Sequence, residues 1–218
     1  MTRSDFVRGI AVLALLASAG CRGPRLNGAA ERYMEKVQKA DEALRKSDVE
    51  RFGDDYADLL EEAEDYFRPG MFSDPPKPGT CMALRKLERQ FPGSHAHRMA
   101  VCTDALLSCY GGDVARAMRL WERRSGDAQW RHQASAYGFE AFPTVLAYAM
   151  TEDARNGGSR KFEQELLTAL QTEYRDAWLF PPRESRRAPV PVRDFIDRPN
   201  AYRSSFVPVS TGRKGGGR

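Results

Sequence analysis

Apolar side chains recur along most of this chain every three or four residues, which is the period of an amphipathic α-helix. Residues 29–45 show the pattern first, and the pair Ser47-Asp48 then offers an N-cap for a second helix that we expect to end at Pro69-Gly70. Two helices joined by a short turn are therefore predicted for this part of the chain.

Three further helical stretches follow, each bounded by turn or capping residues. A helix is expected over Thr80–Phe91, which a Pro-Gly pair ends, and Ser94 caps the next one. Gly111-Gly112 ends that helix, and Asp113 caps the third. These breaks predict short connections between neighbouring helices.

The pattern is weaker over residues 126–142, which are rich in aromatic side chains but lack a clear period. Pro143 suits the first turn of another helix, and Ser159 caps a last one. The apolar stripe of this last helix consists of Phe162, Leu166, Leu170, Tyr174 and Trp178. No segment alternates with period two, so residues 29–180 predict an all-α helical domain.

Residues 181–218 differ from the helical region in composition, being rich in Pro, Arg and Gly. We expect an extended tail with a disordered end, packed back onto the domain through its apolar side chains. These side chains are Val190, Val192, Phe195, Ile196, Tyr202, Phe206 and Val207.

The net charge of +4 conceals an uneven distribution. Residues 21–180 hold 23 basic and 26 acidic residues, whereas residues 181–218 hold nine basic and three acidic ones, a net of +6. Such a tail attracts anionic lipid or peptidoglycan carboxylates weakly and in a salt-dependent way, or is simply solvated. The acidic run Asp54–Asp65 is likewise either a solubilising helix face or a docking site for a basic partner.

The N-terminus has the parts of a secretory signal, with Arg3 and Arg8 before an uncharged run that is too short to span a bilayer, for which about 20 residues are needed. The run ends in Ala17-Ser18-Ala19-Gly20-Cys21, which resembles the lipobox of bacterial lipoproteins. The resemblance implies a signal peptide over 1–20 and a lipid anchor with its tether over 21–28. The alternative is an ordinary thiol behind a different kind of signal.

The resemblance also implies that Cys21 carries acyl chains such as palmitate, enough for stable membrane attachment. Because Arg22, not Asp, follows the cysteine, it implies the outer membrane, with the protein facing the periplasm. Export argues against nucleic acid as a partner of the basic tail.

Two segments, Ser47–Phe52 and Gly112–Ala117, look alike and begin 65 residues apart, near twice the tetratricopeptide period of about 34 residues. Gly112, Ala117 and Trp121 also match that family's spacing of glycine, small and aromatic residues. Residues 30–125 thus resemble a degenerate tetratricopeptide array, which implies stacked helical hairpins with a groove for a peptide or helix. The alternative is a helical bundle without repeats.

Besides Cys21, the chain has Cys81, Cys102 and Cys109. If Cys102 and Cys109 share a helix, they lie about 10.5 Å apart along its axis, beyond the roughly 7 Å that a disulfide bridges. A disulfide would therefore join Cys81 to Cys102 or Cys109, and the alternative is three small buried apolar side chains.

No motif of a catalytic site is present, so we expect neither an enzyme nor a cofactor. We expect no metal site either: His95 and His97 point in different directions on a helix and are predicted to be exposed. The candidate partner-binding residues are Trp121, Trp130 and Tyr137, whose alternative role is in the core.

The leading hypothesis is a lipid-anchored envelope adaptor that binds another envelope protein through its helical groove. The second is a structural lipoprotein that bridges membrane and cell wall through the basic tail, without a specific protein partner.

Overall fold

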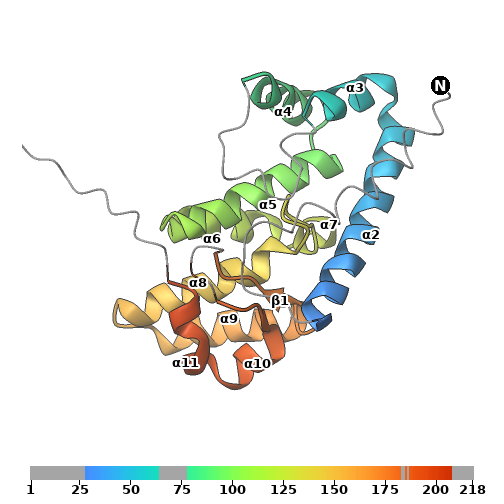
Figure 1. Ribbon diagram of the computed structural model, residues 1–218. Helices are drawn as coiled ribbons and strands as arrows, with labels where there is room; N and C mark the ends of the chain where they lie inside the picture. The colour runs from blue at the N-terminus through green and yellow to red at the C-terminus, as the bar shows by residue number, and fades with distance from the viewer. Residues whose placement is uncertain (1–27, 64–77, 183–184, 186, 208–218) are drawn as a thin grey trace, which may run out of the picture.

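The computed structural model describes residues 28–63, 78–182, 185 and 187–207, and helices dominate this part of the chain (Figure 1). The expected all-α class is confirmed. The helices are α2 (Gly28–Phe52), α3 (Asp54–Glu62), α4 (Pro78–Gln90), α5 (His95–Tyr110), α6 (Val114–Arg124), α7 (Ala128–Arg131), α8 (Ala141–Arg155), α9 (Arg160–Glu173), α10 (Val192–Asp197), α11 (Pro199–Tyr202) and the 3-10 turn η4 (Arg203–Ser205). Two short strands, β1 (Trp178–Leu179) and β2 (Val190–Pro191), pair antiparallel.

Helix α2 runs unbroken past Ser47-Asp48, so the turn expected there is wrong. The break comes instead at Gly53, whose φ of 78° suits glycine, and α3 begins directly after it. Asp48 does not cap a helix that begins next to it in sequence; its carboxylate accepts a hydrogen bond from the backbone N–H of His95, at the start of α5. Of the two similar segments from which the repeat spacing was inferred, Ser47–Phe52 is therefore not a turn between helices.

The boundaries of α5 and α6 agree with the predicted caps. The Ser94 hydroxyl accepts a hydrogen bond from the His97 N–H at 3.2 Å, and the Asp113 carboxylate accepts one from the Arg116 N–H at 3.0 Å. Gly112, with a φ of 91°, lies in the turn between the two helices. Local signals were sufficient here because each cap bonds within its own first turn.

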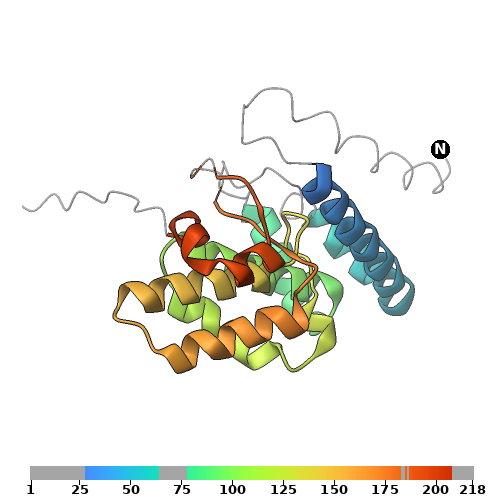
Figure 2. The ribbon, with the colours of Figure 1, turned by 90° about the horizontal axis from the view of Figure 1, so that it is seen from below.

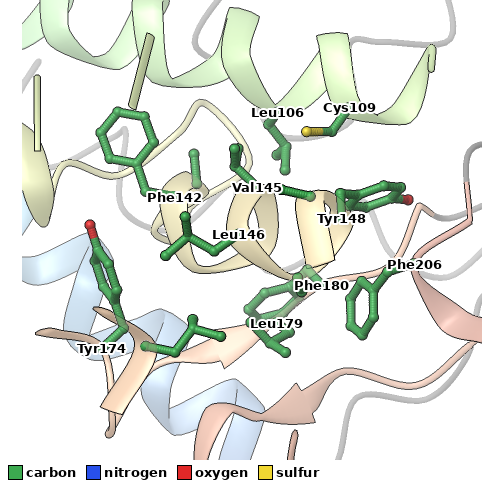
Figure 3. Close-up of a cluster of buried hydrophobic side chains, with 14 of the residues drawn as sticks. Leu106, Cys109, Phe142, Val145, Leu146, Tyr148, Tyr174, Leu179, Phe180 and Phe206 are labelled. Atoms are coloured by element: carbon green, nitrogen blue, oxygen red, sulfur yellow. The ribbon is translucent and has the colours of Figure 1, made fainter. Parts of the chain in front are cut away.

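Helix α8 is the centre of the fold. All residues from Ala141 to Thr151 are buried, as expected of a helix surrounded by other elements. It contacts α5 and α6 on one side and α9, β1 and η4 on the other (Figures 1 and 2). Figure 3 shows the main core around it, with Leu106 from α5 and with Phe180 and Phe206 from the C-terminal part. A smaller cluster around Tyr56 and Leu87 joins α3 and α4 to the start of α5.

The C-terminal part requires two corrections. Residues 192–205 are mostly in short helical turns, not extended, because Val192 and Phe195 of α10 face the core one helical turn apart. Trp178 lies in β1, not in the last helix, and pairs with Pro191. This pairing joins the predicted helical domain, residues 29–180, to the predicted tail, residues 181–218. The prediction that the apolar residues pack back is confirmed most clearly at Phe206, which is fully buried.

Helix α2 lies along one side of the molecule (Figures 1 and 2) and buries only Ala30 and Asp48. None of the helices in the described ranges is both long and apolar enough to cross a membrane. Residues 1–20, for which a signal peptide is expected, Cys21 and the end of the tail after residue 207 lie outside the described residues.

Candidate functional site

A hollow of about 290 Å³ lies where the end of α6, α7 and the second half of α9 meet. Of the three candidate partner-binding residues, only Trp121 lines it. The lining residues are Trp121, Ser125, Arg131, Glu165, Thr168, Ala169, Thr172, Glu173 and Tyr174.

Arg131 fixes one wall of the hollow. Its Nε donates a hydrogen bond of 2.9 Å to the carbonyl of Ser125, at the C-terminus of α6. Its Nη1 forms an ion pair with Glu173 at the end of α9. One guanidinium therefore ties α7 to both neighbouring helices, and its charge is balanced by Glu173.

Two polar atoms beside the hollow have almost no exposed surface and form no hydrogen bond of normal geometry with the described residues: the indole nitrogen of Trp121 and the hydroxyl oxygen of Tyr174. Only 2% of Tyr174 is exposed. Burial raises the pKa of its hydroxyl, and a side-chain hydrogen-bonding interaction with the Trp121 indole lowers it by less. Tyr174 therefore remains protonated.

The threonine hydroxyls on the same surface already donate within α9. Thr168 donates to the carbonyl of Gln164 at 2.8 Å, and Thr172 donates to the carbonyl of Thr168 at 2.9 Å. The polar side chains of the hollow that a partner can reach are the exposed ones of α9, Glu165, Thr168 and Thr172.

A second polar group of residues lies behind Tyr174. The ring of His132 packs edge-on against Tyr174 with centroids 5.6 Å apart, and its Nδ1 lies 3.1 Å from Oε1 of Glu140. Tyr33 of α2 donates to the other Glu140 oxygen at 3.1 Å. The hydrogen bond with Glu140 raises the pKa of His132 despite partial burial, and burial raises the pKa of Tyr33.

The other two candidates, Trp130 and Tyr137, do not line the hollow. Trp130 is buried between Arg124, whose guanidinium lies 4.5 Å from its ring centroid, and His97, whose ring lies 5.5 Å away. Tyr137 is partly buried and stacks on Phe139 at 5.9 Å. Both fit the alternative role in packing.

The expectation that His95 is exposed is wrong, because it lies in a buried polar network below α2. Its Nε2 contacts Oδ1 of Asp41, and Arg98 donates from Nε to Gln133 at 3.1 Å. Gln133 in turn donates to Asp41 at 3.3 Å. The sequence does carry a trace of this network, since Asp41 and Asp48 lie seven residues apart and share one face of the helix.

The cysteines of α5 are both free and buried, and burial raises the pKa of both thiols. Cys102 and Cys109 share one helix, as the argument against a bond between them assumed. The side chain of Cys81 lies outside the described part of the structure, so the pairing prediction stays open. Within the described residues, no cluster of His, Cys, Asp and Glu suits a metal ion.

Comparison with known proteins gives no relative: no protein-family model, no curated protein and no solved structure matches the chain.

Proposed function

We propose that this protein is a lipid-anchored envelope adaptor that holds another envelope protein on the surface formed by α6, α7 and α9. The observation that carries the proposal is the hollow of about 290 Å³ between these helices, which Trp121 and Tyr174 line. Tryptophan and tyrosine are enriched at the anchoring points of protein interfaces.

The proposed architecture is a set of stacked helical hairpins. The hairpin of α5 and α6 around Gly112 supports it, because both helices pack on each other and on α8. The continuous helix through Ser47–Phe52 does not support it, so the hairpins do not follow one strict repeat.

The proposed attachment rests on the sequence Ala17–Cys21, which resembles a lipobox. Acyl chains on Cys21 would hold the domain at a membrane surface, with residues 22–28 as a tether. We propose the outer membrane and its periplasmic face, on the strength of Arg22.

The test is photo-crosslinking in intact cells from Thr168 and Thr172, which are exposed on the rim of the hollow. A crosslinking amino acid at either position replaces a surface side chain, whereas Trp130 and Tyr174 are buried and would not tolerate it. Met82 on α4, 61% exposed, is the matched control.

A discrete protein crosslinked from positions 168 and 172, but not from 82, is the expected result. If both rim positions capture nothing, or only what position 82 captures, the adaptor proposal is wrong.

A further inference from the structure

We infer that copies of this chain associate head to tail, with the outward face of α6 in one copy lying on the outward face of α3 in the next. This surface of α6 is not the one that faces the hollow. Trp121 lies two residues from both Arg119 and Arg123, and therefore on the opposite side of a helix with 3.6 residues per turn. The inference does not depend on the adaptor function.

The outward face of α6 is basic. Arg116, Arg119 and Arg123 are all exposed, and their spacing of three and four residues puts them on one face of the helix. Arg116 forms an exposed ion pair of 2.6 Å with Asp104 of α5. Arg119 and Arg123 form no ion pair with another described residue, not even with Glu122, the acidic residue of α6. Two cations on this face are therefore available to another molecule.

The outward face of α3 is acidic. Asp54, Asp58 and Glu61 are exposed, and α3 contains no basic residue. None of the three forms an ion pair with another described residue. Glu61 also lies in the last turn of α3, where the helix macrodipole disfavours a carboxylate. A cation from another molecule would therefore stabilise this face.

The two faces match when the helices lie antiparallel. Along α6 the arginines are separated by three and then by four residues, and the carboxylates read backwards along α3 have the same spacing. Because both helices rise by about 1.5 Å per residue, every arginine then lies opposite one carboxylate. The pairs are Arg116 with Glu61, Arg119 with Asp58 and Arg123 with Asp54. This arrangement also sets the two helix macrodipoles antiparallel.

The two faces lie in different parts of one chain. Helix α3 packs on α2 and α4, whereas α6 packs on α5 and α8 (Figure 1). Each copy therefore offers one basic and one acidic face, and contacts of this heterologous kind build a closed ring or an open chain of copies. Exposed ion pairs are individually weak and are screened by salt, so we expect association to rise with protein concentration and to fall with salt.

The test is sedimentation velocity of the full-length chain at several protein and salt concentrations. Arg119→Glu with Arg123→Glu makes both faces acidic, and Asp54→Lys with Asp58→Lys makes both faces basic. A fourfold variant with all these changes has faces of opposite charge again, at the wild-type net charge of +4.

We expect the wild type to associate at low salt, each double variant to stay monomeric and the fourfold variant to associate like the wild type. A mixture of the two double variants should also associate, because one keeps the acidic α3 and the other keeps the basic α6. The control is Arg85→Glu with Lys86→Glu, two exposed changes on α4 that alter the net charge as much as the α6 variant does. It should associate like the wild type.

The inference is overturned if the wild type stays monomeric at low salt, if either double variant associates like the wild type, or if the mixture of the two stays monomeric. Loss of association in the α4 control would likewise overturn it, since net charge alone would then be responsible. A monomeric wild type that binds octaglutamate through Arg119 and Arg123 would assign the basic face to a different acidic partner.

Discussion

The carboxylate of Asp48 accepts a hydrogen bond of 2.5 Å from the backbone N–H of His95, the first residue of α5. An N-terminal N–H of a helix has no partner within that helix, so Asp48 supplies from α2 what a local cap supplies elsewhere. The bond is buried, since Asp48 is only 8% exposed. It is one of the contacts that hold α2 to the body of the protein, together with the hydrogen bond from Tyr33 to Glu140 and that from Gln133 to Asp41.

Removing this carboxylate should therefore weaken the whole fold. We expect Asp48→Ala to lower the free energy of unfolding by about 1–2 kcal/mol, the usual cost of losing a helix cap or a buried hydrogen bond. Urea unfolding of the variant measures the effect. Glu50→Ala, an exposed change on the same helix, should stay within about 0.5 kcal/mol. Equal stability of the two variants would show that Asp48 does not hold α2.

The stability should also depend on the protonation of His97. Its Nδ1 accepts a hydrogen bond of 2.9 Å from the Gly93 N–H, which requires the neutral ring. Burial, with smaller effects of Arg124 and Arg98, lowers the pKa of His97 below its ordinary 6.5. As the pH falls through 6.5, the unfolded chain takes up a proton that the folded chain does not, and stability is lost.

Urea unfolding between about pH 5 and about pH 8 tests whether stability falls on acidification. His132 contributes in the opposite direction, because its pKa is raised, so the informative comparison is the wild type against His97→Gln. The glutamine oxygen can replace the acceptor without titrating. We expect a smaller loss of stability on acidification in the variant; an identical pH profile would contradict the assignment.

Phe206 tests whether the C-terminal part belongs to the folded domain. It is fully buried and packs edge-on against Tyr148 and Phe195, with ring centroids 5.8 and 5.6 Å away. Phe206→Ala should cost about 3–5 kcal/mol, measured by thermal or urea unfolding. Leu44→Ala, at a site 45% exposed, should change stability by no more than about 0.5 kcal/mol. A Phe206→Ala variant as stable as Leu44→Ala would mean that this segment is not part of the core.

The alternative function, bridging to the cell wall through the basic tail, needs a deletion that spares this core. Removing residues 181–218 would also remove Phe195 and Phe206, so a loss of wall association would report only unfolding. Removing residues 208–218 keeps both, and we expect the melting temperature to be unchanged. Under the adaptor proposal, sedimentation with purified peptidoglycan is also unchanged; its loss would favour the bridging function.

The sequence predicted best those elements whose signals are local. Ser94 and Asp113 cap their own helices, and the glycine at 112 ends a hairpin, so α5 and α6 could be placed from a few neighbouring residues. The break expected at Ser47-Asp48 failed because the partner of Asp48 is 47 residues away in the chain.

The candidate site was only half predictable for the same reason. Trp121 was identified by its place in a helical pattern, and Tyr174 was assigned to an apolar stripe. That they share a hollow depends on how α6 approaches α9, which Arg131 fixes through contacts with both helices. The stretch around Trp130 shows no clear hydrophobic period because side-chain contacts, such as that of Arg124 with the Trp130 ring, hold it in place. An isolated antiparallel β-bridge between Ala134 and Glu140 also contributes.

The burial of Phe195 and Phe206 also determines when this protein can fold. Both side chains complete a core whose central helix, α8, is made much earlier in synthesis. A nascent chain from which Phe195 and Phe206 have not yet emerged lacks them, so its core stays open until this segment has left the ribosome. A premature stop before Phe195 would therefore release a product with an exposed apolar face.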